Sequence, residues 1–162
     1  LSLTEHFALI EDDAGLLVDY KAAQKQATSR IEEYSIRGFP RSKVEALSGG
    51  NQQRTLLAML QQGLRLLLLE HPTRGLDMES AIWIWQQLKE RARSEGTAII
   101  FVSSDLEDVL HYSDRVLVFF AGEVSEPLDA SATTVEELGL LIGGLQPETP
   151  SKPQSQSLSA TG

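Results

Sequence analysis

The sequence predicts an α/β protein in which helices alternate with the strands of a parallel sheet. Two short apolar runs, 66–69 and 99–102, show no alternation and are bounded by polar residues, as strands buried on both faces are. Around them, apolar residues recur at helical spacing, and such alternation of strands and helices is typical of the α/β class. The 162 residues, 41% of them hydrophobic, suffice for one modest domain or a large part of one.

The first part of the chain, residues 1–46, has a polar and helical pattern. Within it, 19–34 carries apolar side chains at helical spacing, and the Gly-Phe-Pro sequence at 38–40 ends the pattern. A second helix is expected over 48–62, because Ser-Gly-Gly opens it and Gly63 follows its end.

The strand at 66–69 leads to Pro72 and then to a third helix, which should begin after Asp77 as N-cap and stop before Gly96. Ile82 and Trp83 fall outside the apolar stripe of this helix, so they are expected either to be exposed or to pack on segments that this chain lacks. The stripe comprises Ala81, Ile84, Trp85, Leu88 and Ala92.

Beyond the second strand, a short helix is predicted over 106–112, with either Ser104 or Asp105 as its cap. A third strand over 116–120 should turn at Gly122 into a partner at 123–125. Thr134 and Glu137 form a capping-box pair that predicts a last helix, and the composition from residue 146 onward predicts a disordered tail.

Composition excludes several classes of function. The net charge of −9, without a basic block, argues against direct nucleic-acid binding, since phosphate neutralisation needs clustered cations. The sequence has no cysteine, which excludes disulfides, zinc knuckles and thiol catalysis. No apolar run approaches the roughly 18 residues of a membrane span, and no signal peptide is recognisable. The chain begins at Leu1 rather than Met, which suggests a piece of a longer protein.

The start of the second helix is a candidate anion site. Two glycines after Ser48 leave backbone N–H groups uncovered at the positive end of the helix dipole, and the Ser48 hydroxyl offers a further donor. A capped helix after a glycine turn is the simpler interpretation of Ser-Gly-Gly alone. The full segment is more specific: it resembles the signature motif of ABC-type ATPases, with the Asn-Gln-Gln ending of the sugar-importer branch, and reads Leu47-Ser48-Gly49-Gly50-Asn51-Gln52-Gln53-Arg54.

A second segment, 66–77, resembles the Walker B strand and D-loop of the same family. Glu70 ends the strand where a magnesium–phosphate complex needs a hard oxygen ligand, and Asp77 stands in the D-loop. The family usually has Asp followed by Glu where this chain has Glu70 and His71. The resemblance therefore implies that Glu70 coordinates Mg²⁺ and that His71 occupies the position of the catalytic glutamate. Whether His71 accepts a proton or is only structural stays open.

A third segment, 101–109, resembles the switch region, with Ser104 where most family members have a histidine that contacts the γ-phosphate. Ser-Ser followed by an acid is similar to the second ATPase half of sugar or nucleoside importers. The resemblance covers about residues 1–144, and it implies a P-loop NTPase (RecA-like) core with an α-helical signature subdomain. On this basis we expect residues 1–63 to form the helical subdomain, 64–145 part of the ATPase core and 146–162 the tail.

The sequence lacks the P-loop motif Gly-x-x-x-x-Gly-Lys-Ser/Thr, which precedes this region in the family. The resemblance implies ATP and Mg²⁺ in an assembled parent, where Ser48, Gly49, Gly50 and Gln52 would contact the γ-phosphate held by a second ATPase domain in a head-to-tail dimer. It also implies permease subunits, indirectly a solute-binding protein, no nucleic acid, and a peripheral place at the inner face of the cell membrane. The alternatives are a non-transport ABC ATPase and a catalytically degenerate regulatory half.

Overall fold

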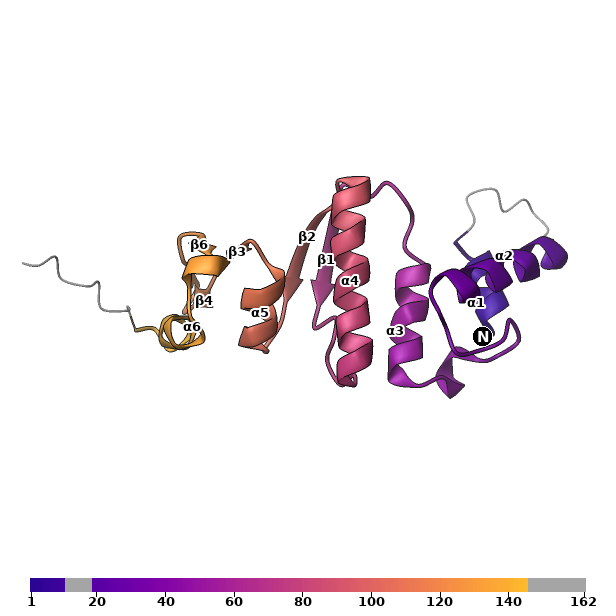
Figure 1. Ribbon diagram of the computed structural model, residues 1–162, viewed down its shortest axis with the longest axis horizontal. Helices are drawn as coiled ribbons and strands as arrows, with labels where there is room; N and C mark the ends of the chain where they lie inside the picture. Colours follow the sequence, from indigo (N-terminus) through magenta and orange to yellow (C-terminus); the bar gives the residue numbers. More distant parts are fainter. Residues whose placement is uncertain (11–18, 146–162) are drawn as a thin grey trace, which may run out of the picture. The chain divides into compact units, whose positions relative to one another are not determined.

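The computed structural model describes residues 1–10 and 19–145 (Figure 1). The chain divides into two compact units, Leu1–Ser104 and Asp105–Gly162, and each is described by itself below. The predicted tail at 146–162 lies outside the described residues. The mixture of helices and paired strands confirms the predicted α/β class.

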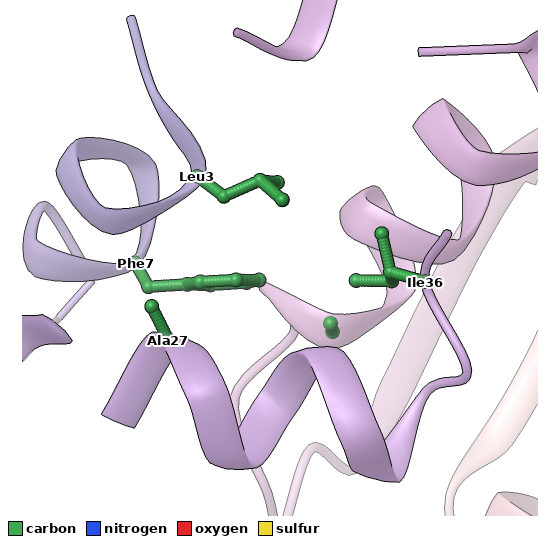
Figure 2. Packing of buried hydrophobic residues seen from close by; sticks show 5 residues of the cluster. Leu3, Phe7, Ala27 and Ile36 are labelled. Atoms are coloured by element: carbon green, nitrogen blue, oxygen red, sulfur yellow. The ribbon is translucent and has the colours of Figure 1, made fainter. Parts of the chain in front are cut away.

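The first unit opens with two helices, α1 (Leu3–Ala8) and α2 (Tyr20–Glu33), followed by the short 3-10 helix η1 (Val44–Ala46). Ser2 and Glu5 form a capping box on α1, and the Asp19 carboxylate caps α2. Figure 2 shows Leu3 and Phe7 of α1 pointing toward Ile36, with Ala27 of α2 beside Phe7, all of them buried. This cluster, which also includes Ala58, anchors the helical part of the unit.

Helix α3 (Gly49–Ala58) begins where predicted but ends four residues before the predicted end at 62. Side chains of a later helix explain the early end. Arg91 donates through Nη2 to the carbonyl of Gln61 at 3.0 Å, and the Glu95 carboxylate accepts from the N–H of Gly63 at 3.0 Å. These bonds hold residues 61–63 in a turn, which local helix propensity could not reveal.

Strands β1 (Leu66–Glu70) and β2 (Ala98–Val102) pair in parallel, with Leu66 opposite Ala98 and Glu70 opposite Val102. Helix α4 (Met78–Glu95) connects them, capped by Asp77 and ended by Gly96 in the left-handed conformation, as predicted. Its buried residues Ile84, Trp85 and Leu88 belong to the predicted stripe. Trp85 packs edge-on against Phe101 of β2, with ring centroids 4.6 Å apart.

The prediction that both strands are buried on two faces is wrong for the described residues. Side chains alternate between the two faces of a strand, and Leu67 is 7% exposed whereas Leu68 is 66% exposed. Ile100, which lies opposite Leu68, is 57% exposed. Helix α4 covers one face of the strand pair, while the other face presents Leu66, Leu68, Ile100 and Val102 to solvent.

In the second unit, helix α5 (Leu106–Tyr112) is capped by Asp105, whose carboxylate accepts from the N–H groups of Glu107 and Asp108. This settles the choice between Ser104 and Asp105. Four strands of two residues and η2 (Ala130–Ala132) follow, and the last helix, α6 (Val135–Ile142), has the predicted capping box of Thr134 and Glu137. The strands are β3 (Arg115–Val116), β4 (Phe119–Phe120), β5 (Glu123–Val124) and β6 (Leu128–Asp129).

The predicted strand 116–120 is interrupted, because the chain changes partner within it. Val116 pairs with Leu128, whereas Phe119 pairs with Val124 across the predicted turn at Gly122. Between them, the backbone of Val118 is bound by Ser125, whose hydroxyl accepts from Val118 N at 3.0 Å and whose N–H donates to Val118 O at 2.9 Å. Val116 and Val118 point into the small core of this unit with Ala130 and Leu138.

Candidate functional site

The N-terminus of α3 is a candidate anion site without a side-chain cap. Of the six α-helices in the described residues, α3 alone has an N-cap side chain that accepts no hydrogen bond from its first turn. Its first turn also carries no acidic residue. Free N–H groups at the positive end of a helix attract an anion, so this end is chemically suited to a phosphate.

The Ser48 hydroxyl is oriented by the side chain of Asn51 rather than by a backbone N–H group of the helix. Asn51 donates through Nδ2 to Ser48 Oγ at 2.7 Å, and its Oδ1 accepts from the N–H of Arg37 at 2.6 Å. Because the hydroxyl oxygen accepts from Asn51, its own hydrogen remains available to donate to an external acceptor. The predicted donor role of Ser48 is compatible with this arrangement.

Gly50 is buried against the beginning of α4. A Cβ atom at this position would lie 2.5 Å from Ser80 Oγ and 3.1 Å from Ser80 Cβ, so the two helices meet here at a distance that only glycine permits. Ser80 donates through both its N–H and its hydroxyl to Asp77, each at 2.9 Å. These hydrogen bonds, with the backbone one first, hold the pKa of Asp77 below its usual value. The structure therefore brings Asp77 beside the anion site.

One turn further along both helices, Arg54 lies over Trp83. The guanidinium carbon is 3.8 Å from the ring centroid, and Nη1 donates to the carbonyl of Tyr34 at 3.4 Å. The Tyr34 and Trp83 rings meet edge-on at 6.4 Å. No local pattern in the sequence predicts a role for Arg54 or Ser80. The available signal was Trp83 itself, which falls outside the apolar stripe of its helix.

Glu70, His71 and Ser104 lie at the other predicted part of the site, the carboxyl end of the parallel strand pair. Glu70 is exposed and lies opposite Val102 in register, and the N–H of His71 donates to Val102 O at 2.8 Å. Ser104 follows two residues after Val102 and is exposed. The topology thus gathers these three residues at one edge, as expected for parallel strands.

His71 adopts a left-handed backbone conformation, with φ of 46°. Glycine takes this conformation most readily, and among the other residues asparagine, aspartate and histidine are enriched in it. Histidine is thus one of the side chains that this turn tolerates, a structural reason for its presence that does not depend on proton transfer.

Two glutamine side chains tie α3 to its surroundings. Gln52, predicted to contact phosphate, donates through Nε2 to the carbonyl of Leu47 at 3.0 Å. Gln53 donates to the carbonyl of Pro72 at 2.9 Å, which connects α3 with the turn that follows β1. The amide of Gln52 therefore has a partner within the chain, while Gln53 links the two predicted parts of the site.

Glu70 is the residue of the site that the sequence predicted as a metal ligand. Within residues 1–10 and 19–145, no three His, Asp or Glu side chains are arranged to hold a metal. Mg²⁺ is commonly held by one or two carboxylates together with substrate phosphates, so Glu70 could supply a single ligand to a metal that arrives with a nucleotide.

Within residues 1–10 and 19–145, no helix is long and apolar enough to cross a bilayer.

Comparisons with known proteins agree with the fold and with the family that the sequence resembles. No protein-family model matches the chain. The nucleoside import ATP-binding protein NupA of Lactococcus lactis is 35% identical over 129 residues, which are 78% of this chain and 25% of NupA. The arabinose import ATP-binding protein AraG of Yersinia pestis is 35% identical over 126 residues, 76% of this chain and 24% of AraG. The chain thus spans about a quarter of the length of these curated relatives.

A solved structure supports the same fold. The ATP-binding cassette MJ0796, a dimer in a post-hydrolysis state bound to ADP and Pi, superimposes with a TM-score of 0.64 and 25% identity, over 82% of this chain and 58% of the cassette. The fold is therefore that of a P-loop NTPase of the ABC ATPase class, of which the chain represents part. In sequence, the chain is a relative of the ATP-binding proteins of sugar and nucleoside ABC importers.

Proposed function

We propose that this chain is part of the ATP-binding and hydrolysing subunit that energises an ABC importer of a sugar, a nucleoside or a similar small solute. The uncapped N-terminus of α3 carries the proposal, because it leaves backbone N–H groups and the Ser48 hydroxyl available to an anion. The similarity to NupA and AraG supports import as the process that the hydrolysis drives.

In this proposal Ser48, Gly49, Gly50 and Gln52 act in trans, on the γ-phosphate of a nucleotide held by a second ATPase domain. The dimeric state of the related cassette supports such a partner. Donors that are already in place stabilise the charge that develops in phosphoryl transfer without reorganisation, and ATP with Mg²⁺ supplies the group that is transferred. Asp77, Glu70, His71 and Ser104 belong to the site built on the chain's own domain, with Glu70 as the Mg²⁺ ligand.

The partners follow from the same proposal. Permease subunits would carry the solute across the membrane, and a solute-binding protein would deliver it to them. The ATPase would lie on the cytoplasmic side, at the inner face of the cell membrane, because it binds the permease from there. The division into a helical subdomain over 1–63 and a core part over 64–145 also remains a proposal.

A specific observation favours unequal sites in the assembled parent. His71 stands where the family has its catalytic glutamate, and its left-handed backbone conformation gives it a structural role. We therefore infer that the site containing His71 and Ser104 turns over slowly, whereas the site that Ser48 closes hydrolyses ATP. A regulatory half with a degenerate site of its own is the second candidate function; a non-transport ABC ATPase is less favoured by the importer relatives.

Steady-state ATPase activity of the assembled parent transporter tests the proposal. Ser48→Ala should lower turnover strongly, whereas His71→Ala should change it little. Loss of a working general base would lower the rate about 10²–10⁴-fold, so the two possibilities for His71 are easy to tell apart. Ser29→Ala, at an exposed serine of α2, is the matched control and should be neutral. If His71→Ala abolishes turnover, the histidine is a working base and the inequality of the sites is wrong. If Ser48→Ala leaves turnover unchanged, the trans role of α3 is wrong.

A further inference from the structure

Arg54 and Trp83 lie outside every role assigned above, yet they join the two helices that carry the candidate site. The guanidinium of Arg54 stacks at 3.8 Å from the Trp83 centroid, and its Nη1 reaches the carbonyl of Tyr34 at the end of α2. Both side chains are partly buried. A cation over an indole ring is an attractive contact with a defined geometry, and partial burial strengthens it.

The spacing of these residues connects them to the anion site. Gly50 and Arg54 are four residues apart and thus share one face of α3, while Ser80 and Trp83 are three apart and share one face of α4. Gly50 meets Ser80, and Arg54 meets Trp83 one turn later. Two contacts on successive turns fix both the position and the rotation of α3 against α4.

We propose that Arg54 and Trp83 are positioning residues that hold the N-terminus of α3 at a set place relative to Asp77. The inference rests on the proposed function, in which that N-terminus acts on the nucleotide of the opposite domain. A donor displaced by a fraction of an ångström loses much of its effect on a transition state, whereas binding of ATP by a P-loop elsewhere would not change. The contact would therefore govern turnover rather than nucleotide affinity.

The test compares Trp83→Leu and Arg54→Met in the assembled parent transporter, each alone and in a Ser48→Ala background. Each single variant should lower kcat by about tenfold with KM for ATP nearly unchanged, and Trp83→Tyr, which keeps a ring under the guanidinium, should retain most activity. With Ser48 already replaced, Trp83→Leu should have a smaller further effect, because the Ser48 hydroxyl is gone and only the backbone donors of Gly49 and Gly50 remain to be positioned. If the losses of kcat caused by Trp83→Leu and Ser48→Ala multiply in full in the double variant, the proposal is wrong.

Trp85→Leu is the matched control, because Trp85 lies two residues away on the same helix but packs on Phe101 of β2. Its damage to the core should multiply with that of Ser48→Ala. Amide hydrogen exchange of the nucleotide-free parent gives a readout besides activity. Peptides covering 49–58 should exchange faster in Trp83→Leu and Arg54→Met, and those covering 66–70 should not.

Unchanged exchange over 49–58 in both variants would overturn the positioning role. A different result separates the inference from the function on which it rests. If Ser48→Ala has no effect on turnover, the proposed function fails, and the exchange data still show whether Arg54 and Trp83 hold α3 in place.

Discussion

A Cβ atom on Gly50 would lie 2.5 Å from the hydroxyl oxygen of Ser80, closer than real Cβ contacts come. The backbone of α3 at Gly50 therefore packs directly against the Ser80 side chain at the start of α4. The Asp77 carboxylate lies beside the same contact. Gly49, one residue earlier, has Leu76 Cδ2 at an ordinary 3.7 Å as its nearest neighbour. Of these two adjacent glycines, only Gly50 lies where packing leaves no room for a side chain.

This difference predicts unequal effects of alanine on the stability of the chain. Gly50→Ala should destabilise by about 1–3 kcal/mol, because Ser80 must move away from the new methyl group. Gly49→Ala should be neutral or stabilising by up to about 1 kcal/mol, since alanine favours the helix. Urea unfolding midpoints measure both. Ser80→Gly should restore Gly50→Ala; a double variant as unstable as the single one would contradict the contact.

Asp77 should make the stability of α4 depend on pH in the acid range. Its folded-state pKa is lowered, chiefly by the backbone hydrogen bond from Ser80 and then by the Ser80 hydroxyl. The stabilisation is thus complete above the unfolded-state pKa of about 3.9 and is lost as the pH falls through the lower folded-state value. Unfolding midpoints of wild type and Asp77→Asn should differ in their slope between pH 5 and pH 2, as a rough window. If the two proteins give parallel curves of unfolding midpoint against pH, Asp77 does not contribute to the pH dependence of stability.

His71 offers a test of backbone strain that is independent of catalysis. At φ of 46°, His71→Gly should stabilise the chain by about 0.5–1 kcal/mol, and His71→Val should destabilise it, because a β-branched side chain is strained there. Thermal unfolding measures both. Destabilisation by glycine would show that the imidazole makes a contact whose loss outweighs the relief of strain.

The exposed face of the strand pair should make the chain self-associate. Leu68→Thr combined with Ile100→Thr places β-branched threonine in both strands but removes most of the apolar surface, so association should fall without loss of stability. Sedimentation velocity reports the association. Leu67→Thr, on the buried face, is the control and should destabilise instead. A wild-type chain that stays monomeric and melts cooperatively above ~65 °C would contradict the prediction.

The 162-residue chain by itself should bind ATP weakly or not at all. Its sequence contains no P-loop, and the donors at the start of α3 lie at an exposed surface where water competes for an anion. Isothermal calorimetry with magnesium-ATP should give little heat. A micromolar affinity in a monomeric sample would show that the chain holds a nucleotide through residues not identified above.

Most element positions could be predicted because their signals are local. Asp77 and Gly96 bound α4, and Thr134 with Glu137 opens α6, since a cap needs only neighbours within one turn. The parallel order that gathers Glu70, His71 and Ser104 at one edge also followed from the alternation of strands and helices. The boundaries failed where distant groups intervene, as at the end of α3, where Arg91 and Glu95 bind the backbone.

The sequence alone predicted the α/β class and, through segments that resemble ABC-type ATPase motifs, the family, because these signals lie within short stretches of the chain. Only the tertiary structure decided which residues support the motifs. Ser80 reaches Gly50 and Trp83 reaches Arg54 because two helices separated by a strand pack side by side, a contact that no local spacing encodes. It also decided that Leu68 and Ile100 are exposed, because burial depends on the elements that cover a strand and not on the strand's own composition.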